Sequence, residues 1–539
     1  MSRDGKKYLA AATILLGLIS LVCCIYLDDV PARDLAHRYA PMAEAFAEGN
    51  WQFAFHPRIP PLATVSGGII AFIFSCSGFL AMQIASALWH CASLVVLWEL
   101  VKRIVPQTPW AAPLTVALGA IFPLTFHMAY SGLRESGKSF VLLLMALALC
   151  GIYRRERSWS NCILLGLSCG LAVLTRVEMI LIAAVVLTGG LVLAFRKQIK
   201  LLPIALAALT AGVCCAVNMV INYYTSGYAV PDQQAVKYLA KVWDGAVPLL
   251  PMSSLLLAAV VLVIPTAWLL ERLSRKLKLR YLLVALAVVL LVTTLRTVQL
   301  DPHREAADYL SDLWAGIFHF GGLFIFLTAA YYAYQGKLSG EMKILLTVFI
   351  CNLAVSMLAF QLGHKILYIS SRYIYSAMPL LLVFMVLGIN EVYELLKKFL
   401  PVRYVNILLV LSIAGIIGGM FFHMIQPQLR DRCKYKIKRQ NVMQLAVMIK
   451  QDEPEYKKIK VKKNMRRYES VKAPKVFFTD SDASYTVMAY LAGGSMTMSP
   501  TQANYVAGEK LPARFRKKAV HIGQVVNRKG KFINLWRVK

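Results

Sequence analysis

The chain has 539 residues, of which 58% are hydrophobic and only 16% are charged. Soluble globular proteins carry more charge on their surfaces, so this composition excludes that class. Hydrophobic runs of about 20 residues recur along the chain, and each is long enough to cross a hydrocarbon core of about 30 Å. We therefore expect an all-α polytopic membrane bundle. The formal net charge of +31 favours contact with anionic membrane lipids.

The apolar runs predict about thirteen membrane-spanning helices. They lie at residues 8–27, 79–101, 110–130, 137–153, 160–175, 178–195, 201–222, 252–270, 281–298, 313–334, 343–361, 373–393 and 404–423. The first run has no A-x-A-like cleavage site, so we expect a retained anchor and not a signal peptide. We interpret the shorter run at residues 63–77 as a re-entrant or interfacial helix.

Basic residues between the spans predict the orientation of the bundle. Short basic clusters follow the even-numbered spans, at residues 102–103, 154–157, 196–197, 271–280, 337–343 and 397–403. The positive-inside rule then places the N-terminus in the cytoplasm and residues 424–539 on the outer side. We expect a multi-pass protein of a bacterial inner (plasma) membrane, with the C-terminal region in the periplasm.

The first external loop, residues 28–78, carries the acidic residues that lie nearest to a predicted span. Asp28, Asp29 and Asp34 follow that span directly, and a functional role for them is as plausible as helix capping or solvation. Further along, apolar residues recur with helical spacing, which is typical of a helix that lies along the membrane interface. We expect Glu44 and Glu48 of that helix to face solvent.

After the last predicted span the chain becomes polar and strongly basic. Residues 424–539 contain 26 Lys and Arg against 8 Asp and Glu, a net charge of +18. An amphipathic helix is predicted at 441–450, strands at 476–480, 520–526 and 531–538, and a further helix at 484–494. The pattern indicates a small, basic α/β domain, separate from a transmembrane domain at 1–423. We expect it to contact membrane lipids and not nucleic acid.

The cysteines and histidines do not indicate a metal site. Most of the eleven cysteines lie inside apolar runs, where cysteine behaves as a small buried hydrophobe. The sequence has no Cys-x-x-Cys or His-Glu-x-x-His pattern. We expect no cofactor and no bound metal, and a requirement for a divalent cation stays open.

Several short motifs occur in order along residues 1–425. They are Arg38-Tyr39-Ala40, Gly49-Asn50-Trp51, His56-Pro57-Arg58-Ile59-Pro60-Pro61-Leu62, Leu133-Arg134-Glu135, Leu174-Thr175-Arg176-Val177-Glu178 and Ser371-Arg372-Tyr373. In these motifs the chain resembles the GT-C class of membrane glycosyltransferases. The nearest branch is the family 39-like one, with the protein O-mannosyltransferases and the bacterial lipid A aminoarabinose transferases. The resemblance implies transfer of a sugar from a polyprenyl-phosphate donor to a lipid, glycan or protein acceptor.

The resemblance also implies an inverting mechanism with an aspartate as general base. In the family this aspartate stands four residues before the tyrosine of the Arg-Tyr-Ala element, whereas Asp34 stands five residues before Tyr39. Asp34 is nevertheless the first candidate, with Asp29, Asp28 and Glu135 as further acidic candidates. The donor phosphate requires cationic or hydrogen-bonding groups. The candidates are Arg372, Arg176, Arg134, Lys365, Arg58 and His56.

Other interpretations of these residues stay open. Arg134 with Glu135, and Arg176 with Glu178, are equally well explained as structural ion pairs at helix ends. Lys365 is better explained by a snorkelling role at the lipid headgroups. A transporter or flippase would require ionisable residues deep within its spans, and the predicted spans are nearly free of them. An enzyme similar to O-antigen ligases is the remaining alternative.

Overall fold

The computed structural model describes most of the predicted membrane domain and parts of the C-terminal region. The residues described are 3–27, 34–55, 59–154, 158–176, 179–197, 199–226, 322–362, 376–452, 475–478, 495–497, 503–516, 518–526 and 532–538. The predicted spans at 252–270 and 281–298 and the predicted helix at 484–494 lie outside these residues.

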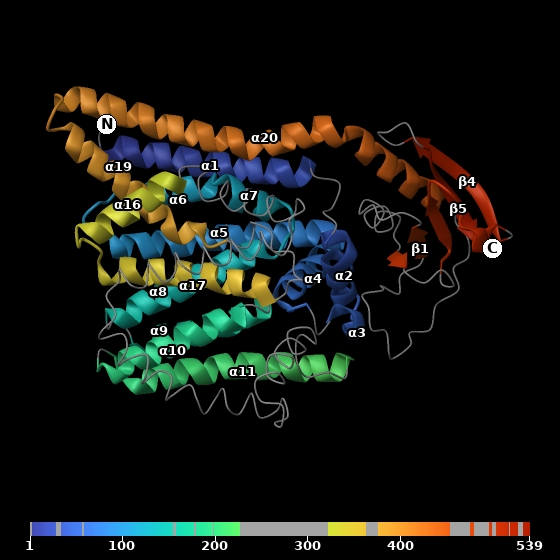
Figure 1. The fold of residues 1–539 in the computed structure, drawn as a ribbon, viewed down its shortest axis with the longest axis horizontal. Coiled ribbons are helices and arrows are strands. Elements are labelled where there is room, and N and C mark those ends of the chain that lie inside the picture. Colours follow the sequence, from blue (N-terminus) through green and yellow to red (C-terminus); the bar gives the residue numbers. More distant parts are fainter. Residues whose placement is uncertain are drawn as a thin grey trace.

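Long apolar helices form a bundle (Figure 1). They are α1 (Arg3–Leu27), α5 (Gly78–Ile104), α6 (Ala111–Ala120), α7 (Pro123–Tyr130), α8 (Glu135–Tyr153), α9 (Ser158–Thr175), α10 (Met179–Phe195), α11 (Leu201–Ser226), α16 (Gly322–Tyr334), α17 (Gly340–Leu362), α19 (Leu382–Leu396) and α20 (Val402–Gln451). Within the described residues, six helices are long and apolar enough to cross a membrane. The predicted membrane bundle with a small C-terminal sheet is confirmed, and the count of about thirteen spans stays a prediction.

The third predicted span, 110–130, is divided into two helices. α6 ends at Ala120, and α7 begins at Pro123. Proline cannot donate the backbone hydrogen bond that a continuous helix requires, and it disfavours helical geometry in the residue before it. Phe122 accordingly has extended backbone angles (φ −64°, ψ 113°). Pro123 therefore starts a new helix within this hydrophobic run.

Small residues allow neighbouring helices of the bundle to pack closely. A Cβ atom at Gly166 of α9 would lie 2.5 Å from the carbonyl oxygen of Ala207 in α11, and one at Gly170 would lie 2.4 Å from the Cβ of Cys214. Such contacts replace the hydrophobic effect as the force that holds helices together in lipid. The ten cysteines whose side chains the structure describes are free thiols, in keeping with their predicted role as small apolar residues.

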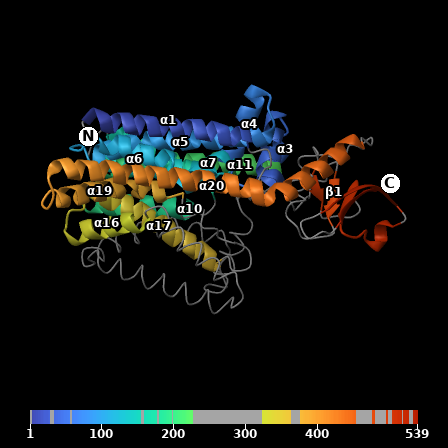
Figure 2. The same ribbon diagram turned by 90° about the horizontal axis from the view of Figure 1, so that it is seen from above.

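Four short helical segments lie together at one end of the bundle, which we call the α2 end (Figure 1). They are η1 (Leu35–Tyr39), α2 (Ala40–Ala47), α3 (Trp51–Ala54) and α4 (Leu62–Phe74). α4 has only 13 residues, so it is too short to cross the hydrocarbon core. Its last residues, Phe72, Ile73 and Phe74, are exposed. This agrees with the interpretation of residues 63–77 as a re-entrant or interfacial helix, and Figure 2 shows α4 projecting from the bundle.

The opposite end of the bundle is held by an arginine. Arg154, just after α8, donates from Nε to Oε1 of Glu341 at the start of α17, and from Nη2 to the carbonyl oxygen of Arg103 at the end of α5. This network ties three loops that are far apart in the sequence. The basic clusters at 102–103 and 154–157 therefore lie at the end opposite to Asp34 in the part of the chain that the structure describes.

α20 links the bundle to the C-terminal sheet. It continues without interruption for 50 residues, so the predicted span at 404–423 and the predicted helix at 441–450 belong to a single helix. It runs along the bundle and passes beyond the α2 end (Figure 2). α20 thus connects the bundle to the C-terminal sheet, with its last part packed against β4.

The C-terminal sheet has five strands in the order β2-β1-β3-β5-β4. They are β1 (Lys475–Phe478), β2 (Ser495–Thr497), β3 (Tyr505–Gly508), β4 (Ala519–Val526) and β5 (Phe532–Val538). β1 pairs in parallel with β2 and β3, whereas β5 is antiparallel to β3 and β4. The three predicted strands correspond to β1, β4 and β5. The short strands β2 and β3 were not predicted, because three or four residues carry too little periodicity to indicate a strand.

A substitution at Gly78 tests how closely α2 approaches the start of α5. A Cβ atom there would lie 2.1 Å from the carbonyl oxygen of Ala40, so this backbone has no room for a side chain. We expect Gly78→Ala to destabilise the protein by about 1–3 kcal/mol, the usual cost of overpacking. Thermal unfolding of the detergent-solubilised protein measures it. Gly212→Ala is the control, because nothing lies within 4 Å of a Cβ atom there; equal unfolding temperatures would contradict the close contact.

A candidate sugar-transfer site at the α2 end

Asp34 lies directly before a turn of π-helix, η1. The backbone N–H of Ala40 donates to the carbonyl oxygen of Leu35, which is the i to i+5 hydrogen bond of that helix type. In a π-helix residues five apart share a face, as residues four apart do in an α-helix. Asp34 and Tyr39, which are five residues apart, therefore lie toward a common face of the turn.

The π-turn is anchored on the bundle by its apolar side chains. Leu35 and Tyr39 are buried in a cluster that includes Met82 of α5 and Leu133 of the loop before α8. Gly132 in that loop has a positive φ of 70°, and a Cβ atom there would lie 2.9 Å from Leu35. Glycine adopts this backbone conformation without strain and leaves room for Leu35. The glycine thus lets the loop with Leu133 and Arg134 approach the π-turn.

The buried hydroxyl group of Tyr39 is influenced by nearby charged side chains. Burial raises the pKa of Tyr39 above its ordinary value, with smaller contributions from Arg134 and Arg176, which lower it, and from Glu135 and Asp34, which raise it. The guanidinium carbon of Arg134 lies 5.2 Å from the centroid of the Tyr39 ring. The tyrosine hydroxyl is therefore neutral at physiological pH and is able to donate a hydrogen bond.

A buried ion pair joins the start of α8 to the residue that follows α9. Arg176 Nη1 donates to Glu135 Oε1 over 3.0 Å, and the two side chains are only 6% and 1% exposed. Removing two charges from water is costly, and their attraction offsets this only when both partners remain. The predicted pairing of Arg134 with Glu135 is thus replaced by a pairing of Arg176 with Glu135, and Glu178 lies outside the described residues.

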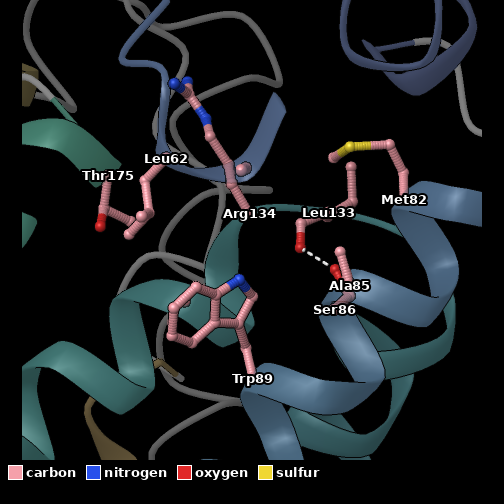
Figure 3. A pocket seen from close by; sticks show the side chains of 10 residues that line it. Leu62, Met82, Ala85, Ser86, Trp89, Leu133, Arg134 and Thr175 are labelled. Atoms are coloured by element: carbon pink, nitrogen blue, oxygen red, sulfur yellow. Dashed lines mark hydrogen bonds between the residues drawn. The ribbon is translucent and has the colours of Figure 1, made fainter. Parts of the chain in front are cut away.

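A small recess adjoins this charged group, with about 10 Å³ of free space, which is enough for about one water molecule. It is lined by residues of α4, α5, α8, α9 and the loop before α8: Leu62, Ala63, Met82, Ala85, Ser86, Trp89, Leu133, Arg134, Gly137 and Thr175. In Figure 3 the Trp89 ring rises from α5 into the space between Thr175 and Arg134, while Ser86 donates to the carbonyl oxygen of Leu133. Nε of Arg134 is buried and has no hydrogen-bond partner within the described part of the chain.

Lys138 is a residue of this region that the sequence analysis did not select. It is fully buried in α8, and its backbone N–H donates to the carbonyl oxygen of Arg134 over 3.2 Å. It lies three residues after Glu135, so both side chains share one face of the helix. The sequence could have indicated Lys138, because it is a lysine inside the predicted span at 137–153. An ionisable residue in a membrane helix is energetically costly and usually has a function.

The structure describes only part of the predicted site. It brings together Asp34, Arg134, Glu135 and Arg176 at the α2 end. The remaining candidates, Asp28, Asp29, His56, Arg58, Lys365 and Arg372, lie outside the described residues. The described residues contain no group of three potential metal ligands.

The two acidic residues of the α2 segment, Glu44 and Glu48, differ in their exposure to solvent and in their contacts. Glu44 Oε1 accepts a hydrogen bond of 3.0 Å from the backbone N–H of Gly78 at the start of α5, so the expectation that this side chain faces solvent was wrong. A carboxylate at this position satisfies one of the unpaired donors of the first turn and complements the helix dipole. Glu48 is exposed, as expected.

The Glu135–Arg176 pair generates a prediction about stability. We expect Glu135→Gln or Arg176→Met alone to destabilise the protein by about 3–5 kcal/mol, because each leaves an uncompensated buried charge. The double variant Glu135→Leu/Arg176→Met should recover most of the loss. Thermal unfolding in detergent is the measurement, and Lys337→Gln, in a more exposed ion pair with Glu391, should cost less than about 1 kcal/mol. A double variant as unstable as the sum of the two single variants would contradict the analysis.

Comparison with known proteins identifies similar sequences and folds. Residues 58–222 match the family model described as dolichyl-phosphate-mannose-protein mannosyltransferase. No curated protein matches the sequence. The oligosaccharyltransferase AglB from Archaeoglobus fulgidus, in complex with an inhibitory peptide and a dolichol-phosphate, has a TM-score of 0.56 at 13% identity, covering 98% of this chain and 74% of that one. Its complex with zinc and sulfate has a TM-score of 0.54 at 12% identity, covering 97% and 72%.

ArnT from Cupriavidus metallidurans, bound to undecaprenyl phosphate, is also similar, with a TM-score of 0.44 at 11% identity, covering 100% of this chain and 99% of that one. The matched family model includes α4 to α11, and therefore both partners of the buried ion pair and the recess. The likeness to AglB extends over nearly the whole chain. Residues 58–222 thus resemble the dolichyl-phosphate-mannose-protein mannosyltransferases in sequence, and the fold of the chain is similar to that of the archaeal oligosaccharyltransferase AglB.

Proposed function

We propose that the protein is a membrane glycosyltransferase that moves a sugar from a polyprenyl-phosphate donor to a lipid, glycan or protein acceptor on the outer side of the membrane. The observation that carries this proposal is the buried Arg176–Glu135 ion pair next to Arg134, which lies over the ring of Tyr39 and lines the recess. Asp34 directly precedes the π-turn that contains Tyr39. An acid and several cations at one edge of a membrane bundle suit a substrate whose phosphate remains at the lipid interface.

In the proposed reaction Asp34 accepts the proton of the acceptor hydroxyl as that oxygen attacks the anomeric carbon. A new glycosidic bond forms on the face opposite to the phosphate, so the configuration inverts. The bond between the anomeric carbon and the phosphate oxygen breaks, and the polyprenyl phosphate leaves with the electron pair. General-base assistance of this kind is typically worth about 10²–10⁴-fold in rate.

Negative charge grows on the phosphate oxygen as this bond breaks. Cationic donors that are already in place stabilise that charge without reorganisation. Arg134 suits this role, because it lines the recess and its buried Nε has no partner within the described part of the chain. Arg176 is held in position by Glu135, and Lys138 lies one turn further into α8. Arg372, Lys365, Arg58 and His56 remain candidates for the same phosphate.

The orientation of the site is part of the proposal. Arg103 and Arg154, which belong to the predicted cytoplasmic clusters, contact each other at the end opposite to Asp34. The positive-inside rule then places the α2 end on the outer side of the membrane. The AglB structure holds a dolichol-phosphate, a lipid of the class proposed here as donor.

Asp34→Asn tests the general base. We expect the purified variant in nanodiscs, given a panel of polyprenyl-phosphate sugars, to transfer sugar at least about 10²-fold more slowly than the wild type. Glu48→Gln is the matched control, because this acid is exposed on the same segment. Full activity of Asp34→Asn with loss in Asp29→Asn would move the base to Asp29. Movement of the labelled lipid across the membrane without transfer would favour a flippase.

Arg134→Gln tests the phosphate site independently of turnover. Hydrogen bonds to a charged group contribute about 1.5–3 kcal/mol, so we expect binding of polyprenyl monophosphate to weaken by roughly 10- to 100-fold. Fluorescence titration with a labelled short-chain polyprenyl phosphate measures the affinity. Lys337→Gln, at the opposite end of the bundle, should bind as the wild type does. Unchanged affinity in Arg134→Gln would remove Arg134 from the proposed site.

A further inference from the structure

Ala36, two residues after Asp34, belongs to the core of the C-terminal sheet and not to that of the bundle. It is only 3% exposed. The apolar cluster that contains it is otherwise made of residues from the end of α20 and from the sheet: Leu445, Ala446, Ile449, Val476, Tyr505, Ala507, Val525 and Leu535. The π-turn is therefore part of the contact between the membrane domain and the C-terminal sheet.

Neighbouring residues of the π-turn are buried in different cores. Leu35 and Tyr39 pack with Met82 and Leu133 on the bundle, whereas Ala36 packs with the C-terminal cluster. The segment that carries Asp34 thus lies between two packed bodies. π-helical turns are rare and costly, and unusual backbone conformations persist only where the surrounding structure holds them.

The sheet presents one particular face to the π-turn. Side chains alternate between the faces of a strand: Tyr505 and Ala507 of β3 belong to the Ala36 cluster, while Val506 between them packs with Phe515 and Trp536 on the other face. The contact with Ala36 can therefore be altered without altering the core on the opposite face.

Polar contacts hold the end of α20 on the sheet. Asp452, directly after α20, accepts a hydrogen bond of 2.9 Å from the Tyr505 hydroxyl and pairs with Arg537 of β5 over 2.8 Å. The last turn of α20 and strands β3 and β5 are thereby joined. Ala36 packs against this assembly and not against a single loose side chain.

We propose that the C-terminal sheet domain is a positioning element for Asp34 and that Ala36 is the positioning residue through which it acts. The domain holds the π-turn against the bundle, so that the Asp34 carboxylate stays on the face shared with Tyr39. A small side chain suits this position, because Ala36 is buried in the C-terminal cluster. The inference rests on the proposed role of Asp34 as general base.

The test perturbs the contact from both sides. Ala36→Leu introduces bulk on the π-turn, and Ala446→Leu introduces the same bulk on α20, far away in the sequence. A small misplacement of a catalytic group costs on the order of 10²-fold in rate, so we expect kcat to fall by about that factor in both variants. KM for the polyprenyl-phosphate donor should change by less than about threefold, since the phosphate ligands are untouched.

Two controls separate positioning from damage to the fold. Ala36→Ser adds little volume and should retain kcat within about threefold of the wild type. Phe515→Leu weakens the core on the other face of the sheet and should also leave kcat within about that range, although it loosens the domain. Large and equal losses of kcat in Phe515→Leu and Ala446→Leu would show that the intact domain, and not its contact with Ala36, is what matters.

Hydrogen exchange provides a readout that does not depend on activity. We expect the backbone amides of residues 34–39 to exchange about tenfold faster in Ala446→Leu than in the wild type, because the π-turn has lost one of its two supports. Unchanged exchange together with wild-type kcat in Ala36→Leu and Ala446→Leu would overturn the inference. A different result would be faster exchange in Ala446→Leu together with full activity in Asp34→Asn. It would show that Asp34 is not the general base, while the contact between the sheet and the π-turn would remain supported.

Discussion

The buried pairing of Glu135 with Arg176 is the interaction on which the α2 end depends. Both side chains lie out of contact with water, where an unpaired charge would destabilise the fold by several kcal/mol. The pair fixes the start of α8 to the residue after α9 and sets the position of Arg134 and Lys138 on the same turn of α8. The guanidinium group of Arg176 is therefore held in place by Glu135, and a fixed cation of this kind is what the proposed stabilisation of a leaving group requires.

The α2 end also contains a backbone conformation that is rare in proteins, the π-helical turn η1. Asp34 directly precedes the π-turn that contains Tyr39, and residues five apart share a face in this helix type. The bundle supports this turn through Leu35, and the C-terminal sheet supports it through Ala36. The long α20 connects the two supports, because it packs along the bundle and ends on the sheet. The C-terminal sheet therefore packs, through Ala36, against the segment that carries the proposed base Asp34.

The two ends of the bundle have different chemistry. At the end opposite to Asp34, the Arg154 side chain bonds to Glu341 and to the backbone of Arg103, and these polar contacts tie loops together. At the α2 end, Arg134 lies over the ring of the buried Tyr39 and lines a small recess together with Trp89 and Leu62. The first arrangement satisfies its charges internally, whereas in the second the Nε atom of Arg134 is buried without a hydrogen-bond partner in the described part of the chain.

The sequence by itself determined the class of protein, because long apolar runs have no other stable environment than a bilayer. The resemblance of its motifs to those of GT-C glycosyltransferases also indicated Asp34, Arg134, Glu135 and Arg176 as candidates. The sequence could not determine which arginine pairs with Glu135, that Glu44 caps α5, or that Lys138 is buried beside them. Those facts depend on how helices far apart in the chain pack, and burial and pairing are properties of that packing. Only the tertiary structure placed Ala36 in the core of a sheet about 400 residues away, because helical periodicity carries no information about a partner on another domain.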